Sequence, residues 1–211
     1  MRPRAIVFDL DGTLIDSRRD IAAAVNQVRA ARNLASLPVD TVEGMVGEGA
    51  RVLLQRALPE MPAVEEASLL AEFLRHYEAV CLATTRPYDG IDAVLERATD
   101  RRLALALLTN KPERISRMIV ESFGWGRYFK VTAGGDTYPS RKPDPRGLID
   151  VAAQLGVPIA ETVLVGDSAI DGQTAQAAGA PWIHVTWGYG KQDALDLPCW
   201  ARVDRPADLI R

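Results

Sequence analysis

The 211-residue sequence predicts an α/β protein with a doubly wound parallel sheet and a small all-helical domain inserted after the first strand. Short apolar runs alternate with helical patterns along most of the chain, as in repeated β-α units. The runs are almost continuously apolar, which is typical of parallel strands covered by helices on both faces. One long segment after the first run contains helical patterns only. These observations favour a Rossmann-like sheet with one helical insertion.

Five apolar runs are predicted as strands, and the segments between the later runs as helices. Pro112 stands where a first-turn proline is tolerated, and Gly156 follows a last apolar turn as helix-ending glycines do. The predicted strands are 5–8, 103–108, 128–133, 162–165 and 182–186. The predicted helices of the sheet domain are 90–99, 112–123, 145–155 and 168–178.

The segment from Ser17 to Ala83 is predicted to form the helical insertion because it contains no strand-like run. Apolar residues recur at helical spacing after Ser17, within 41–58 and within 64–82. The predicted domains are therefore 1–16 with 84–211 for the sheet, and 17–83 for the insertion. Because the insertion begins just after the first strand, we expect it to act as a lid over the end of that strand.

Composition and charge argue against several classes of function. The formal net charge is -3, and no basic patch of the kind that binds nucleic acid is present. No apolar run approaches the roughly 18 residues of a membrane-spanning helix, and the first run is too short for a signal peptide. The two cysteines and two histidines have no metal-ligand spacing. We expect a cytoplasmic monomer or homodimer with no nucleic-acid or membrane partner.

Two aspartates, Asp9 and Asp11, directly follow the first predicted strand. Residues two apart in an extended chain face the same side, and ligands of doubly wound sheets bind beyond the carboxyl ends of the strands. Two carboxylates so close repel each other unless a cation or a shared proton compensates. The pair therefore indicates metal-assisted chemistry.

Three further polar segments stand where strands end or helices begin. They are Thr109-Asn110-Lys111, Lys142-Pro143 and Gly166-Asp167-Ser168-Ala169-Ile170-Asp171. Carboxylates, an ammonium group, a hydroxyl and free backbone N–H groups would then meet at one edge of the sheet. This set fits an anionic substrate held by a hard divalent cation.

In this order, with Asp9-Leu10-Asp11-Gly12-Thr13 first, the four segments resemble the motifs of the haloacid dehalogenase superfamily of phosphohydrolases. The resemblance implies that family's α/β core and small helical cap. It also implies a Mg²⁺-dependent phosphatase that acts on a small-molecule phosphate ester through an aspartyl-phosphate. Asp11 favours phosphate esters over dehalogenation, because a halide leaves without a proton and an alkoxide gains from one.

The resemblance assigns a role to each motif residue. Asp9 would be the nucleophile, and Asp11 would be the general acid and then the general base. The Asp9 carboxylate, the Asp11 backbone carbonyl and the Asp167 carboxylate would bind Mg²⁺. The phosphate would be bound by Gly12, Thr109, Asn110 and Lys142. Ser168 and Asp171 would stand behind these groups, with Asp171 orienting metal-bound water or Lys142.

The insertion is expected to select the substrate. Segments 46–54, 86–90 and 134–143 resemble bacterial phosphoglycolate phosphatases, although Asp144 replaces their usual histidine. The candidate specificity residues are Gly47, Glu48, Gly49 and Arg51. Arg51 has a planar fork suited to a substrate carboxylate, and is equally consistent with a surface arginine. A sugar-phosphate or amino-sugar-phosphate phosphatase, a phosphosugar mutase and a non-catalytic phosphate-binding regulator remain as alternatives.

Overall fold

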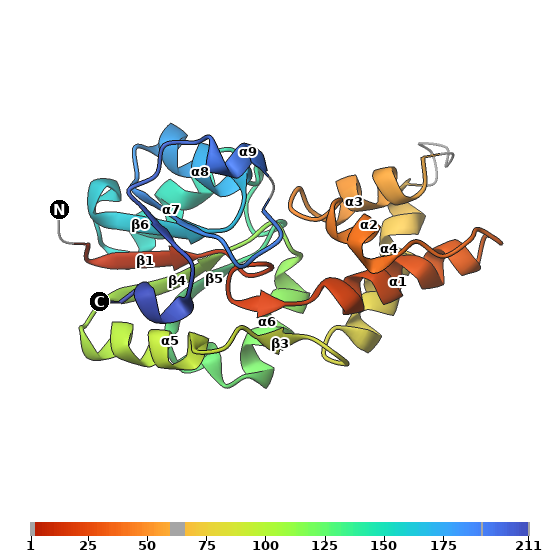
Figure 1. Ribbon diagram of the computed structural model, residues 1–211, viewed down its shortest axis with the longest axis horizontal. Coiled ribbons are helices and arrows are strands. Elements are labelled where there is room, and N and C mark those ends of the chain that lie inside the picture. Colours follow the sequence, from red (N-terminus) through yellow and green to blue (C-terminus); the bar gives the residue numbers. More distant parts are fainter. Residues whose placement is uncertain (1–2, 60–65, 191, 211) are drawn as a thin grey trace. The chain divides into compact units, whose positions relative to one another are not determined.

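A parallel six-stranded sheet forms the larger part of the protein, in the order β5-β4-β1-β6-β7-β8 (Figure 1). The computed structural model describes residues 3–59, 66–190 and 192–210. The chain builds outward from β1 to one side and then resumes on the other, so the doubly wound α/β class is confirmed. The strands are β1 (Ala5–Phe8), β4 (Ala104–Leu108), β5 (Phe129–Ala133), β6 (Thr162–Gly166), β7 (Trp182–Val185) and β8 (Ala201–Val203).

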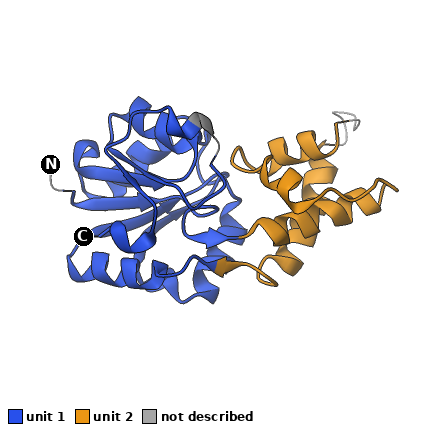
Figure 2. Ribbon diagram, viewed as in Figure 1, with its two compact units in different colours: residues 1–16, 87–211 blue, residues 17–86 orange. Residues whose placement is uncertain are grey.

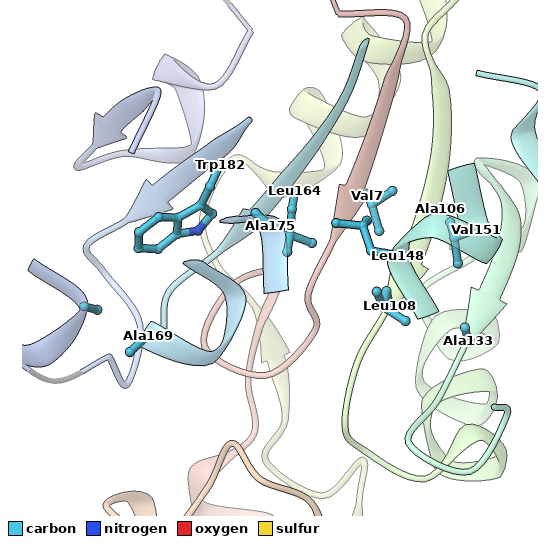
Figure 3. Close-up of a cluster of buried hydrophobic side chains, with 11 residues drawn as sticks. Val7, Ala106, Leu108, Ala133, Leu148, Val151, Leu164, Ala169, Ala175 and Trp182 are labelled. Atoms are coloured by element: carbon cyan, nitrogen blue, oxygen red, sulfur yellow. The ribbon is translucent and has the colours of Figure 1, made fainter. Parts of the chain in front are cut away.

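Helices cover both faces of this sheet, which explains why the strands are continuously apolar. In Figure 1, α7 and α8 lie on one face and α5 and α6 on the other. Val7, Leu108 and Leu164 from the strands pack with Leu148 of α7 and Ala175 of α8 in one buried cluster (Figure 3). The helices are α5 (Ile91–Asp100), α6 (Glu113–Ser122), α7 (Arg146–Leu155), α8 (Ala169–Ala178) and the short α9 (Gln192–Leu195). Three 3₁₀ turns, η2 (Trp125–Arg127), η3 (Ile159–Glu161) and η4 (Pro206–Asp208), complete this part.

The chain divides into two compact units, residues 1–16 with 87–211 and residues 17–86 (Figure 2). The sequence predicts a return to the sheet domain at residue 84, and the compact sheet unit resumes at residue 87. In the second unit, α1 packs against α4 through buried side chains that include Val25, Phe73 and Tyr77. The helices of this unit are α1 (Arg18–Ala30), α2 (Val39–Glu43), α3 (Ala50–Ala57) and α4 (Glu66–Val80). The predicted start of the last helix, at 64, lies outside the described residues.

Three short strands were not predicted. β8 is a three-residue strand at the edge of the large sheet, and its central residue, Arg202, is exposed. β2 (Ile15–Asp16) and β3 (Arg86–Pro87) form a separate two-stranded sheet. Within the described ranges, no helix is both long and apolar enough to cross a bilayer.

Candidate active site

The carboxyl ends of β1, β4 and β6 lie side by side and bring three of the sequence motifs together. Phe8, the last residue of β1, is in register with Leu107 of β4 and Val165 of β6. The segments that follow these three residues therefore leave the sheet at the same edge. Asp9 is fixed there because its backbone N–H donates to the carbonyl of Val165 at 2.9 Å.

Asp9 is a buried carboxylate that faces an ammonium group. Its residue is 8% exposed, and Oδ1 lies 2.9 Å from Lys142 Nζ. Burial disfavours the charged form and raises the pKa of Asp9 to about 6, against the opposing influence of Lys142. The neighbouring carboxylates of Asp171 and Asp11 act in the same direction as burial. A cation beside Asp9 would therefore favour its ionised form.

Lys142 is held between two carboxylates. Its Nζ lies 2.6 Å from Oδ1 of Asp171, a side chain that is fully buried. Burial disfavours the ammonium, but Asp171 and Asp9 outweigh it and raise the pKa of Lys142 above its usual range. Oδ2 of Asp171 accepts hydrogen bonds from Ser168 N at 3.1 Å and Ser168 Oγ at 2.6 Å, in a capping box that begins α8. Asp171 therefore fixes both the lysine and the first turn of the helix.

Asp167, at the end of β6, is oriented by a loop that the sequence did not single out. Its Oδ2 accepts backbone hydrogen bonds from Tyr189 at 2.7 Å and Gly190 at 3.0 Å. Burial, with Asp171 and Asp9 adding to it, raises the pKa of Asp167 well above its usual range. Gly12 has φ +79°, and a Cβ there would overlap the Asp167 carboxylate. Glycine at position 12 therefore permits the first motif to lie against the fourth.

The second motif ties its own strand to the lysine loop. Asn110 donates from Nδ2 to the carbonyl of Lys142 at 2.8 Å, so the end of β4 fixes the backbone of that lysine. Thr109 is held by its own N–H, which donates to Ala133 O at 3.0 Å. Thr109 and Asn110 are 3% and 6% exposed, and Lys142 is 5% exposed. The second motif and the lysine are therefore both buried.

Asp11 has a cationic partner that the sequence analysis did not assign. Lys111 Nζ lies 2.8 Å from Oδ1 and 2.9 Å from Oδ2 of Asp11. The two side chains are 3% and 11% exposed. Asp11 and Asp9 each therefore face a different lysine. The signal was present, since Lys111 follows Thr109-Asn110 directly, but its target depends on β1 and β4 being neighbours.

The carboxylates could hold a divalent cation. Oxygen atoms of Asp9, Asp167 and Asp171 lie within 4.8 Å of one another, and all three residues are buried. The four aspartates of the motifs exceed the two lysines that pair with them by two negative charges. Burial raises the pKa values of Asp9 and Asp167, and the neighbouring carboxylates add to this effect. The site therefore has the oxygen ligands and the excess negative charge that a divalent cation requires.

The predicted specificity residues lie in the helical unit, away from the motif residues in the sequence. Gly47 and Gly49 have φ values of +125° and +93°, a backbone conformation that favours glycine. Arg51, in the first turn of α3, pairs with Glu66 at 2.6 Å, and Glu48 pairs with Arg56. These charged side chains are 27–47% exposed, in contrast to the buried groups of the sheet unit.

Comparisons with known proteins define the class. The family model for haloacid dehalogenase-like hydrolases matches residues 6–185. A phosphoglycolate phosphatase of Xanthomonas campestris pv. campestris is 36% identical over 209 residues, which are 98% of this chain and 95% of that protein. One of Cereibacter sphaeroides is 38% identical, with 98% and 97% of the two chains covered.

A solved structure gives the same result for the fold. The crystal structure of "a predicted phosphoglycolate phosphatase" from Haemophilus somnus has a TM-score of 0.93 and 30% identity, and 100% of this chain and 97% of that one are covered. The chain belongs to the haloacid dehalogenase-like hydrolase family, as its four motifs predicted. The predicted enzyme class, a phosphoric monoester hydrolase, agrees with the names of these relatives.

Proposed function

We propose that the protein is a Mg²⁺-dependent phosphatase that hydrolyses 2-phosphoglycolate, or a closely similar small phosphate monoester, through an aspartyl-phosphate. The observation that carries the proposal is that buried Asp9 lies 2.9 Å from Lys142 and has a carboxylate oxygen within 4.8 Å of those of Asp167 and Asp171. This arrangement offers a nucleophile, a fixed positive charge and oxygen ligands for a cation within one site. The names of the full-length relatives support the choice of substrate.

The first chemical step is attack of Asp9 on phosphorus. A carboxylate oxygen of Asp9 forms the new bond as the bond from phosphorus to the leaving oxygen breaks. Lys142 offsets charge on the transferring phosphoryl group, and Thr109, the Asn110 N–H and Gly12 bind its oxygens. When bound by Asp9, Asp167 and the Asp11 carbonyl, Mg²⁺ would allow an anionic nucleophile to approach an anionic ester.

Asp11 handles the protons of both steps. It donates a proton to the departing alkoxide in the first step. In the second step it accepts a proton from the water that attacks the phosphorus of the aspartyl-phosphate, which releases phosphate and restores Asp9. The Asp171–Lys142 pair holds the phosphate-facing ammonium in place throughout.

The helical unit is proposed to choose the leaving group. Gly47, Glu48, Gly49 and Arg51 supply two glycine backbone positions and two charged side chains on one short segment. Because Arg51 is half-exposed, its pairing with Glu66 can exchange for a pairing with a substrate carboxylate at little cost. The proposed partner is thus a small carboxylated phosphate ester, and the proposed place of action is the cytoplasm.

A phosphate-release screen tests this function. The purified protein would be incubated with Mg²⁺ and with 2-phosphoglycolate, sugar phosphates, amino-sugar phosphates or nucleotides, and kcat/KM would be compared. We expect the highest value for 2-phosphoglycolate, no activity in EDTA and recovery when Mg²⁺ is added. A higher kcat/KM for a sugar phosphate would show that the substrate is a sugar phosphate and not 2-phosphoglycolate. Conversion of a sugar 1-phosphate to its 6-phosphate without phosphate release would indicate a mutase. Metal-independent turnover would refute the cofactor.

A further inference from the structure

Lys111 is a buried ammonium group with a defined target. The residue is 6% exposed, and its Nζ contacts both carboxylate oxygens of Asp11, at 2.8 and 2.9 Å. An ammonium removed from water is costly unless it is paired and hydrogen-bonded. Contact with both oxygens satisfies that requirement, and it also limits rotation of the Asp11 carboxylate about its last side-chain bond.

The backbone of Lys111 is fixed independently of this ion pair. Its carbonyl accepts a hydrogen bond from Gly135 N at 2.8 Å, and its N–H donates to Thr109 Oγ1 at 3.3 Å. The lysine side chain therefore starts from a fixed backbone position in the loop after β4, and its ammonium restricts the position of the Asp11 carboxylate.

The two lysines of the site serve different carboxylates. Lys142 pairs with Asp9 and Asp171, whereas Lys111 pairs with Asp11. Lys142 comes from the loop that precedes α7. Lys111 comes from the loop that follows β4, the strand next to β1. The separation matters because Asp9 must bond to phosphorus while Asp11 must reach the leaving oxygen. Each carboxylate thus has its own fixed cation.

We propose that Lys111 is a positioning residue that aims the Asp11 carboxylate at the leaving-group oxygen, and this inference rests on the proposed phosphatase function. A carboxylate offers about four lone-pair sites, so one bond to each oxygen leaves sites for proton transfer. Acid-base catalysis requires a heavy-atom separation near hydrogen-bond length, and a small misplacement costs much of the rate. The ion pair fixes that geometry before the substrate binds.

The dependence of rate on the leaving group tests the proposal. Aryl phosphates with an acidic leaving group, such as p-nitrophenyl phosphate, need little protonation, whereas alkyl phosphates such as 2-phosphoglycolate depend on it. We expect Lys111→Met to lower kcat/KM for the alkyl ester by about 10- to 100-fold and for the aryl ester by less than about threefold. A role in folding alone would lower both values by the same factor.

Two further variants and a matched control complete the experiment. Lys111→Arg keeps the charge and is expected to recover most of the alkyl-ester activity. In an Asp11→Asn background, Lys111→Met is expected to cause no further loss, because the group that it positions is already gone. Lys130→Met, at an exposed lysine of β5, is expected to match the parent with both esters. If Lys111→Met does not fold, Lys111→Gln provides the same comparison.

Equal losses for the two esters, or full additivity with Asp11→Asn, would overturn the role of Lys111. That failure is distinct from failure of the proposed function. If the parent protein releases phosphate from alkyl esters and Asp9→Asn does not, the phosphatase stands and only the positioning role is lost. If the parent protein does not release phosphate from any ester, both the phosphatase and the positioning role fail.

Discussion

The two units of the protein keep their charged residues in different environments. In the sheet unit, the carboxylates and lysines of the motifs are buried and paired at fixed distances, as with Lys142 and Asp171 at 2.6 Å. In the helical unit, Arg51 and Arg56 form pairs whose side chains are 27–47% exposed. Removing one partner of a buried ion pair lowers the free energy of unfolding by about 3–5 kcal/mol. An exposed pair contributes only about 0–1 kcal/mol to it. This difference supports the proposed division, in which the buried groups carry the chemistry and the exposed groups select the substrate.

Removal of the proposed nucleophile is expected to have the largest effect on activity. Asp9→Asn keeps the size of the side chain and is expected to lower kcat by about 10⁴-fold or more, because the covalent step is lost. Steady-state phosphate release measures the effect, and circular dichroism provides the check on folding. Activity within tenfold of the parent protein would remove Asp9 from the mechanism.

A second test removes the cation that faces Asp9. Lys142→Met is expected to lower kcat/KM by about 10²- to 10³-fold, since one fixed charge on the transferring group is lost. It also leaves Asp171 buried without its ammonium partner, which destabilises the fold by about 3–5 kcal/mol. Both effects are measured, by kinetics and by urea unfolding, against Lys130→Met. If the variant keeps its activity, Lys142 is a structural residue only.

Asp20 is an exception in the helical unit and sharpens the comparison. This carboxylate is buried and accepts hydrogen bonds of 2.6–3.0 Å from the backbone and hydroxyl groups of Thr84 and Thr85. Burial alone would raise the pKa of Asp20, but these donors outweigh it and lower the pKa. Asp20→Ala is expected to destabilise the helical unit by about 3 kcal/mol at neutral pH.

The pH dependence of this effect has a defined sign. Because the folded pKa lies below the unfolded one, the Asp20 carboxylate contributes its stability above the unfolded value of about 3.9 and loses it as pH falls through the folded value. The difference in the stability of the helical unit between the parent protein and Asp20→Ala should therefore narrow below about pH 4. Amide hydrogen exchange in α1 and α4 measures this stability in both proteins. A gap that widens in acid would show that the carboxylate is not the stabilising form.

The smallest expected effect concerns the exposed charges. Arg51→Ala is expected to raise KM for 2-phosphoglycolate about tenfold, the equivalent of one charge-assisted hydrogen bond, and to leave KM for glycerol phosphate unchanged. Its stability should change by less than about 0.5 kcal/mol. Arg56→Ala, on the same helix, is the matched control. Equal changes for the two esters would return Arg51 to an ordinary surface position.

Much of the sheet could be predicted because parallel strands buried on both faces are continuous apolar runs. β8 could not, since Ala201–Val203 is short, lies at the edge and carries an exposed arginine. The positions of three of the four motifs were predictable from the strand ends, but the partners of their side chains depend on strand order. For this reason the sequence did not predict the pairing of Lys111 with Asp11, which the structure shows.

The loop that follows β7 illustrates a second limit. Tyr189 and Gly190 orient Asp167 through backbone N–H groups, so no side-chain chemistry in the sequence marks them. The role of the specificity segment 47–51 could not be predicted from the sequence for a different reason. Its glycines and exposed charges are common on protein surfaces, and their use depends on the ligand.

Asp9 is proposed to carry the phosphoryl group during turnover. The most direct measurement uses the Asp11→Asn variant with p-nitrophenyl phosphate, because the first step with this ester needs little protonation while the second step is slowed. The reaction would be quenched with acid during turnover, and the intact protein and its peptides would be analysed by mass spectrometry. We expect one added phosphoryl group on the peptide that contains Asp9, and none when the Asp9→Asn substitution is also present. Phosphate release with no phosphoryl group on the protein, or with the group on another residue, would contradict it.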